Sequence, residues 1–184
     1  MWTWIAVIFA VPSAQSVSRQ WREAASFCAI AAGAIGCIAA GIFADRIGDT
    51  LQAADNSSRI AARARVTIIC MTASGTCCLL AAGLIRHFTA LVAVSMIWGV
   101  AIVADSAQFS AVVSEVSDQR YVGTALTLQT ALGFLLTTFS IRACSSIAAR
   151  WGWSWAIVSL AVGPFLGCLA MWRLRRCSAS ATHG

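Results

Sequence analysis

The chain has 184 residues, of which 59% are hydrophobic and only 11% are charged. A soluble domain carries about 25% charged residues, so this composition excludes an ordinary soluble domain and indicates a membrane protein. The net charge of +6 comes from arginines that are scattered between apolar segments and form no basic face, which argues against nucleic-acid binding.

The apolar pattern predicts an all-α polytopic membrane protein with five to six transmembrane helices, because a span needs about 20 mostly apolar residues. The first segment is the weakest, since it is short and contains Pro12. It lacks the basic region that opens a signal peptide, so a short membrane helix is the better interpretation. The predicted helices cover residues 2–17, 24–44, 64–85, 88–113, 123–148 and 153–172 of a helical domain 1–176, with a tail at 177–184.

One connection, between the second and third predicted helices, is about twenty residues long and rich in charge. Arginines concentrate on the cytoplasmic side of membrane proteins. If this connection is cytoplasmic, eight arginines lie inside and four outside, and Arg142 completes the total of 13. We therefore expect a bacterial inner-membrane protein with its C-terminus in the cytoplasm. The N-terminus is also inside if all six segments span, and outside if the first does not.

Small residues recur along the second and sixth predicted helices at the spacing that lets two helix backbones approach closely. This spacing indicates tight helix packing, either within one chain or between chains. Pro164 should also kink the sixth helix, because proline removes a backbone hydrogen bond. The small residues are Ala32, Gly33, Gly36, Cys37, Ala40, Gly41 and Ala44 in the second helix, and Gly163 and Gly167 in the sixth.

Residues 41–48, Gly-Ile-Phe-Ala-Asp-Arg-Ile-Gly, resemble the G-x-x-x-D-R-x-G signature of the major facilitator superfamily of transporters. In that family the signature joins the second and third helices of a six-helix half, which is where this segment falls among the predicted helices. Residues 104–134 also resemble the family, in the cytoplasmic turn between the fourth and fifth helices of its C-terminal half. The resemblance implies the C-terminal six-helix half of a major-facilitator-type bundle, truncated so that its first helix is clipped. It departs from the family at Asp49, where a basic residue is usual.

The adjacent charges of Asp45 and Arg46 have two interpretations. One is a solvated pair that ends a helix, since charge is cheap where water is near. The other, which the resemblance implies, is a gating latch in which Asp45 faces the positive end of a neighbouring helix and Arg46 pairs with Glu115. Gly41 and Gly48 would then permit a tight turn and a close helix approach. These contacts would hold one conformation of the transporter and break in the other.

Asp105 lies inside the predicted fourth helix, where an ionisable group is a functional candidate. It is either a second choice as partner of Arg46 or a contact for a proton or substrate. Gln108, Gln129 and Arg142 extend this candidate pathway, although Arg142 could instead snorkel to the outer interface. Interhelical hydrogen bonds are the simpler interpretation for the polar residues of the fifth helix, namely Thr127, Gln129, Thr130, Thr137 and Thr138.

Eight cysteines are present, and seven of them fall in apolar segments. None has the spacing of a metal site, so we interpret them as small packing residues, with disulfide or metal roles as the alternative. The chain contains no Ser–His–Asp set, HExxH helix, P-loop or Rossmann glycine pattern. We therefore expect no enzymatic activity, no cofactor and no metal.

The resemblance implies a secondary active transporter that moves a small molecule or ion across the lipid bilayer by rocking two halves about a midplane site. One half lacks the opposite wall of such a pathway, so the chain would pair with a second six-helix half or with itself. Two alternatives stay open: an inactive truncated fragment, and a non-transporting membrane scaffold that self-associates through its glycine stripes.

Overall fold

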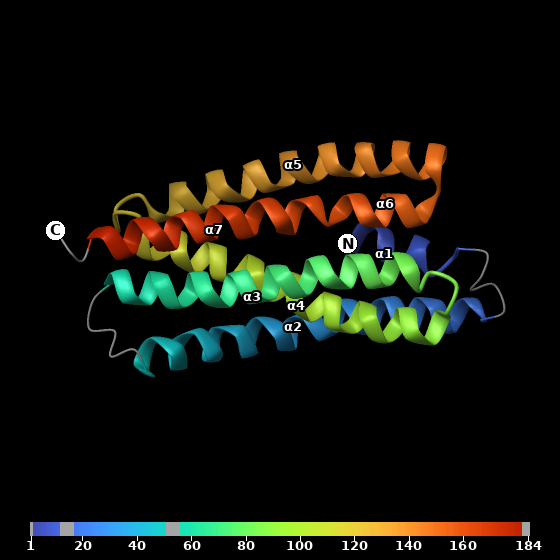
Figure 1. The fold of residues 1–184 in the computed structure, drawn as a ribbon, viewed down its shortest axis with the longest axis horizontal. Helices are drawn as coiled ribbons and strands as arrows, with labels where there is room; N and C mark the ends of the chain where they lie inside the picture. Colours follow the sequence, from blue (N-terminus) through green and yellow to red (C-terminus); the bar gives the residue numbers. More distant parts are fainter. Residues whose placement is uncertain (1, 12–16, 51–55, 182–184) are drawn as a thin grey trace.

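The structure is a computed structural model that describes residues 2–11, 17–50 and 56–181 (Figure 1). Helices joined by short turns make up these three ranges, and no strand occurs in them. The helices are α1 (Trp2–Ile8), α2 (Arg19–Thr50), α3 (Asn56–Gly83), α4 (Phe88–Val116), α5 (Val122–Trp151), α6 (Trp153–Leu160) and α7 (Val162–Ala181).

Five segments of the described ranges are long and apolar enough to cross a membrane. They lie in α2, α3, α4 and α5, and in α6 and α7 taken together. The shortest has 21 residues, which at 1.5 Å per residue reaches about 30 Å, the thickness of a bilayer's hydrocarbon core. The chain is therefore an all-α polytopic membrane protein, as its composition predicts.

The helices extend beyond the apolar segments that predicted them. The second helix was expected at 24–44 and runs over Arg19–Thr50, and the third begins at Asn56, about two turns before its expected start. Polar residues can continue a helix past the apolar region, because each backbone group keeps its partner within the helix. Hydropathy identifies the apolar part of each span and therefore underestimates the length of the helix.

Helix α1 forms a short apolar wedge that is much shorter than the span predicted for the first segment. It was expected to run over residues 2–17, but α1 has only seven residues, which is about 10 Å of helix. Ile5, Ile8 and Phe9 are buried in the apolar core that α1 shares with α3, α4 and α6. The ring of Phe9 meets that of Phe88 edge-on at 5.7 Å between centroids. Residues 12–16, the rest of the predicted segment, lie outside the described ranges.

Two glycines form a close helix contact between α2 and α4. A Cβ atom added to Gly33 would lie 2.3 Å from Cγ2 of Val103, and one added to Gly36 would lie 2.5 Å from the backbone oxygen of Val100. Only glycine fits at these two positions, because real Cβ contacts are never so short. The close packing predicted from the small residues of α2 is confirmed here, and it occurs within one chain. We call this contact the α2–α4 seam.

The last span is broken three residues before Pro164. Proline has no backbone N–H, so the carbonyl of Leu160 loses the hydrogen bond that a continuous helix would give it. Helix α6 ends just before Ala161, whose backbone N–H donates to the carbonyl oxygen of Val158 at 3.0 Å. The helix is thus interrupted between α6 and α7, at the place where Pro164 was expected to disturb it.

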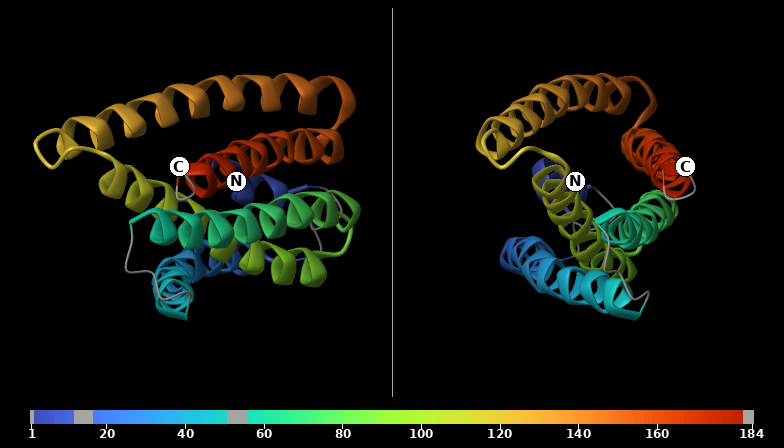
Figure 2. Two further views of the ribbon diagram at one scale, coloured as in Figure 1. Left: turned by 60° about the vertical axis from the view of Figure 1, so that its left-hand side comes forward. Right: turned by 90° about the vertical axis from the view of Figure 1, so that its left-hand side faces the viewer.

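α5 stands apart from the other spans. In the main bundle α3 lies between α4 and α7, and α2 packs on α4 (Figure 1). α5 arches along the edge of this bundle, contacting α4 and α6, and its middle is set off from the other helices (Figure 2). A single residue, Gly152 with φ of 87°, turns the chain from α5 into α6. Cys144 is the buried residue of α5, and most of this helix is exposed on the isolated chain.

Candidate functional site: a charge cluster around Arg63

Four polar side chains meet where α2 ends, α3 begins and α4 ends. Arg63 of α3 donates from Nε to Oε1 of Glu115 on α4 at 2.7 Å. Its Nη1 donates to Oε1 of Gln108, also on α4, at 3.3 Å, and its Nη2 donates to Oδ1 of Asp45 on α2 at 3.4 Å. One guanidinium thus ties three spans together. We call these four residues the Arg63 cluster.

The helices themselves place the four side chains. Gln108 and Glu115 are seven residues apart on α4, so they lie two turns apart on one face. Arg63 is two turns inside α3 because that helix begins early, at Asn56. Next to the cluster lies a small apolar core of Ala40, Ala44, Val66 and Ala104, whose short side chains allow the three helices to converge.

The two ion pairs differ in their exposure to water. The side chains of Arg63 and Glu115 are 20% and 21% exposed, whereas that of Asp45 is 67% exposed. Charge-assisted hydrogen bonds are strongest when short and shielded, and salt screens exposed pairs most. The Arg63–Glu115 pair is therefore the inner, stronger contact, and the Arg63–Asp45 pair is the outer, weaker one. With two carboxylates around one guanidinium, the three charges sum to −1.

The segment that resembles the transporter signature is helical, because α2 continues to Thr50. It was expected to be a loop, and that expectation is wrong. Gly41 faces open space, where an added Cβ would meet nothing within 4 Å, so the close approach expected there occurs at Gly33 and Gly36 instead. The packing of Gly48 lies outside what the structure describes.

Arg63 is the residue that sequence reasoning missed as the centre of the site. It was counted as one of several arginines in a loop, and the partner of Glu115 was expected to be Arg46. The cation that lies on Glu115 at 2.7 Å is that of Arg63, and the pairing of Arg46 with Glu115 stays a prediction. Asp45 likewise contacts the side chain of Arg63, two turns inside α3. The Asn-Ser-Ser run at 56–58, a typical helix start, was the signal that could have placed Arg63 inside α3.

The four candidate pathway residues do not form one site. Gln108 belongs to the Arg63 cluster and is 2% exposed. Asp105 lines a groove near that cluster, and Arg142 is exposed on α5. The buried Oε1 atom of Gln129 has no hydrogen-bond partner within the described part of the chain. The structure therefore divides the predicted pathway between a charge cluster and a groove.

The threonines of α5 bond within their own helix, so the expected interhelical hydrogen bonds are wrong for them. Each hydroxyl donates to the carbonyl oxygen four residues earlier, a common way for threonine to satisfy itself in an apolar helix. The distances run from 2.8 to 3.0 Å for Thr127, Thr130, Thr137 and Thr138.

A groove of about 910 Å³ runs between α5 and the main bundle, bounded by α3, α4, α6 and α7. Its wall on α4 is one stripe of Trp98, Ile102, Asp105 and Phe109, which are three or four residues apart and share a face. Phe139 lies on the α5 side. We call this cavity the Asp105 groove.

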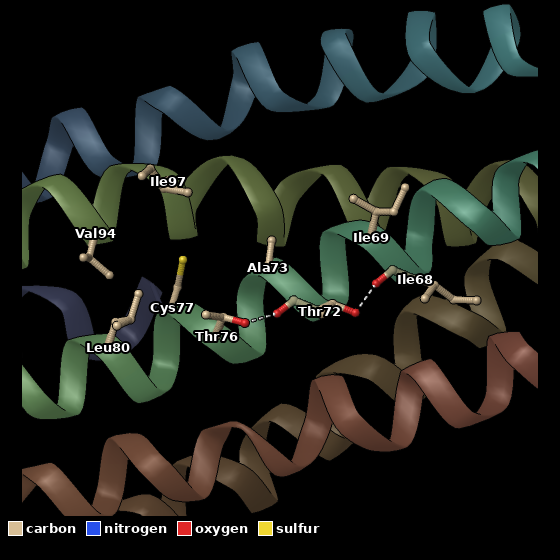
Figure 3. A pocket seen from close by; sticks show the side chains of 9 residues that line it. All are labelled: Ile68, Ile69, Thr72, Ala73, Thr76, Cys77, Leu80, Val94 and Ile97. Carbon is tan, nitrogen blue, oxygen red and sulfur yellow. Dashed lines mark hydrogen bonds between the residues drawn. The ribbon is translucent and has the colours of Figure 1, made fainter.

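A second pocket, of about 490 Å³, lies between α3 and α4 and has no charged residue in its lining (Figure 3). Its two hydroxyl groups belong to Thr72 and Thr76, which donate to the carbonyl oxygens of Ile68 and Thr72 at 2.7 and 2.8 Å. These donors are already used within α3, so the pocket presents an almost purely apolar surface.

Comparison with known proteins finds no matching protein-family model, no matching curated protein and no matching solved structure.

Proposed function

We propose that this chain is a secondary active transporter for a small solute, built like one six-helix half of a major-facilitator-type protein. The observation that carries the proposal is the Arg63 cluster. It lies at one end of the spans, and Asp45, within the segment that resembles the transporter signature, is one of its members. In a chain with only 11% charged residues, three charges joined across three spans call for a specific role.

The cluster would act as a latch between conformations. Its inner pair, Arg63 with Glu115, is shielded enough to hold α3 against α4, while the outer contact to Asp45 is open to water. A movement that tilts α2 away would break the longer 3.4 Å contact first and hydrate the rest. Such stepwise release fits a switch in which one element changes packing between two states.

A second half would face the exposed side of α5. Transport by alternating access needs two walls that rock about a common site. In this chain the Asp105 groove has α5 as its outer wall, and α5 is mostly exposed along its length. We place the second half, from another chain or another copy, against this side.

Three of the five glycines that favoured a self-associating scaffold are covered within the chain. α4 covers Gly33 and Gly36 in the α2–α4 seam. Met71 of α3 covers Gly167, since an added Cβ there would lie 2.3 Å from its terminal methyl carbon. Gly41 and Gly163 have nothing within 4 Å of an added Cβ, so they are the open glycines left to the scaffold alternative.

The test of the proposed function is solute exchange across membrane vesicles that contain the full chain and are loaded with a metabolite extract. Mass spectrometry then measures which solutes leave faster than from vesicles without the chain. We expect at least one such solute, and we expect Asp45→Asn to slow its exchange without reducing the amount of inserted protein. Asp118→Asn, at an exposed carboxylate in the turn after α4, is the matched control and should leave exchange unchanged. Equal exchange with and without the chain would overturn the proposal, and full activity in Asp45→Asn would overturn the latch.

A further inference from the structure

Asp105 is the single charged residue in the lining of the Asp105 groove. Its Oδ1 accepts a hydrogen bond from the hydroxyl of Ser106 at 3.1 Å, and it forms no ion pair within the residues that the structure describes. A carboxylate inside a membrane span is costly, and such groups usually pair with a cation or contact a substrate. No cation of the described part pairs with Asp105, so a positively charged ligand in the groove would find an unpaired carboxyl group there.

The other polar groups of the groove are already engaged. Ser74 accepts from the indole N–H of Trp98 at 3.1 Å. Ser140 and Ser159 donate to carbonyl oxygens of their own segments at 2.9 and 2.7 Å. A sugar-like solute needs many hydrogen bonds, but Ser140 and Ser159 already use their hydroxyl donors, and Ser74 already accepts a hydrogen bond from Trp98.

The chemistry of the groove also excludes two other classes of solute. A bare metal ion such as Mg²⁺ or Ca²⁺ needs about six oxygen ligands, and the groove offers one carboxylate. An anion would meet the charge of Asp105 with no cation in the lining to balance it. The fitting ligand therefore carries positive charge and is mostly apolar.

The walls match that description. Trp98, Phe109 and Phe139 place aromatic rings in the lining, and aromatic faces attract cations as well as apolar groups. The volume of about 910 Å³ lies within the usual range of about 300–1,000 Å³ for small-molecule sites. We propose that the Asp105 groove binds a lipophilic organic monocation, with its charge beside Asp105 and its apolar groups against the aromatic walls. This inference rests on the proposed function in one respect, since the cation would be the cargo.

Equilibrium binding to the purified full chain in lipid nanodiscs tests the proposal with two probes of nearly equal size and shape. Tetraphenylphosphonium is a lipophilic monocation, and tetraphenylborate is the corresponding anion. We expect saturable binding of the cation at least about 10-fold tighter than that of the anion after subtraction of empty nanodiscs. Equal binding of both probes, or none above empty nanodiscs, would overturn the proposal and leave lipid tails as the occupant.

Two variants locate the site. Asp105→Asn should weaken binding of tetraphenylphosphonium by at least about 10-fold, because the amide has the size of the carboxylate without its charge. Phe139→Ala, at an exposed position where folding is not at risk, should weaken it by a smaller factor of about 3-fold. Asp118→Asn is the control and should bind as the unaltered chain does. Unchanged affinity in Asp105→Asn would contradict the assignment, and the comparison of the two probes needs no variant at all.

The failure of this proposal is distinguishable from failure of the proposed function. Binding at equilibrium requires no movement across the membrane, so saturable cation binding without any solute exchange would overturn transport alone. Exchange of some other solute, together with no preference for the cation, would overturn the assignment of the groove alone.

Discussion

At the scale of single residues, the two carboxylates of the Arg63 cluster form ion pairs of unequal strength with the guanidinium. Glu115 lies at 2.7 Å and is shielded, whereas Asp45 lies at 3.4 Å and is exposed. A shielded ion pair is costly to break from one side, because the remaining charge is left without compensation. An exposed pair is worth less, and salt weakens it. The same guanidinium therefore provides one contact for stability and one that is easily released.

A double-mutant cycle should measure this inequality directly. We expect a coupling energy of about 1–3 kcal/mol between Arg63→Gln and Glu115→Gln, and less than about 1 kcal/mol between Arg63→Gln and Asp45→Asn. The measurement is unfolding in mild detergent at low and high salt, and only the coupling to Asp45 should fall with salt. Arg19→Gln, in the exposed pair with Glu23 at the other end of α2, should cause no measurable change. Equal couplings for the two acids would contradict the assigned geometry.

The two acids of the Arg63 cluster were easier to predict from the sequence than its central residue, Arg63. Asp45 and Glu115 stand out because each is an acid at the end of an apolar segment. Arg63 does not, because its pairing with Glu115 joins residues 52 apart and depends on how α3 and α4 are turned against each other. Hydropathy carries no information about that rotation. Asp105 was recognised from its depth alone, but the aromatic groove around it depends on the packing of five helices.

At the scale of helices, the length and apolar character of each span were predictable, while their ends and contacts were not. The spans were found because a bilayer demands about 20 apolar residues. The helical turns beyond them at Arg19 and Asn56 are polar and leave no hydropathy signal. Among the small residues of α2, spacing alone could not tell Gly36, which touches α4, from Gly41, which faces open space.

Alanine substitutions at these two glycines should have opposite effects. Gly36→Ala would place a Cβ 2.5 Å from the backbone oxygen of Val100, so the helices must separate, at a net cost of about 1–3 kcal/mol. Gly41→Ala meets nothing within 4 Å and should be neutral or stabilising by up to about 1 kcal/mol, because alanine favours the helix. Detergent-induced unfolding of the two variants provides the measurement. A loss of stability at Gly41 equal to that at Gly36 would show that the α2–α4 seam is wrongly placed.

At the scale of the whole molecule, the described ranges contain five candidate spans, and we expect each of them to cross the membrane. An odd number of crossings would put the start of α2 and the end of α7 on different faces. The Arg63 cluster and the end of α7 then share one face, and the wedge formed by α1 lies near the other (Figure 1). This expectation corresponds to the branch of the topology prediction in which the first segment does not span.

Reporter insertions test this topology. We expect alkaline phosphatase to be active when inserted after His87, in the turn before α4, and inactive after Gln119, in the turn before α5. A fluorescent protein should show the opposite pattern, because it folds only in the cytoplasm. A third insertion after Gly152 should behave like that after His87, since α5 crosses back. The same result at His87 and Gln119 would contradict a spanning α4.

The α2–α4 seam has a consequence for how this protein can vary over evolutionary time. The seam holds α2 at Gly36, and Asp45 reaches Arg63 farther along the same rigid helix. One residue inserted between them would turn Asp45 by about 100° around the helix axis and carry its carboxylate away from the guanidinium. Between Gly36 and Asp45 the chain can therefore exchange side chains but cannot change its length. Within this part of the chain, insertions and deletions should occur in the connection after Thr50. In an alignment of related sequences, the position of the gaps would then indicate the spacing constraint between Gly36 and Asp45 better than residue conservation would.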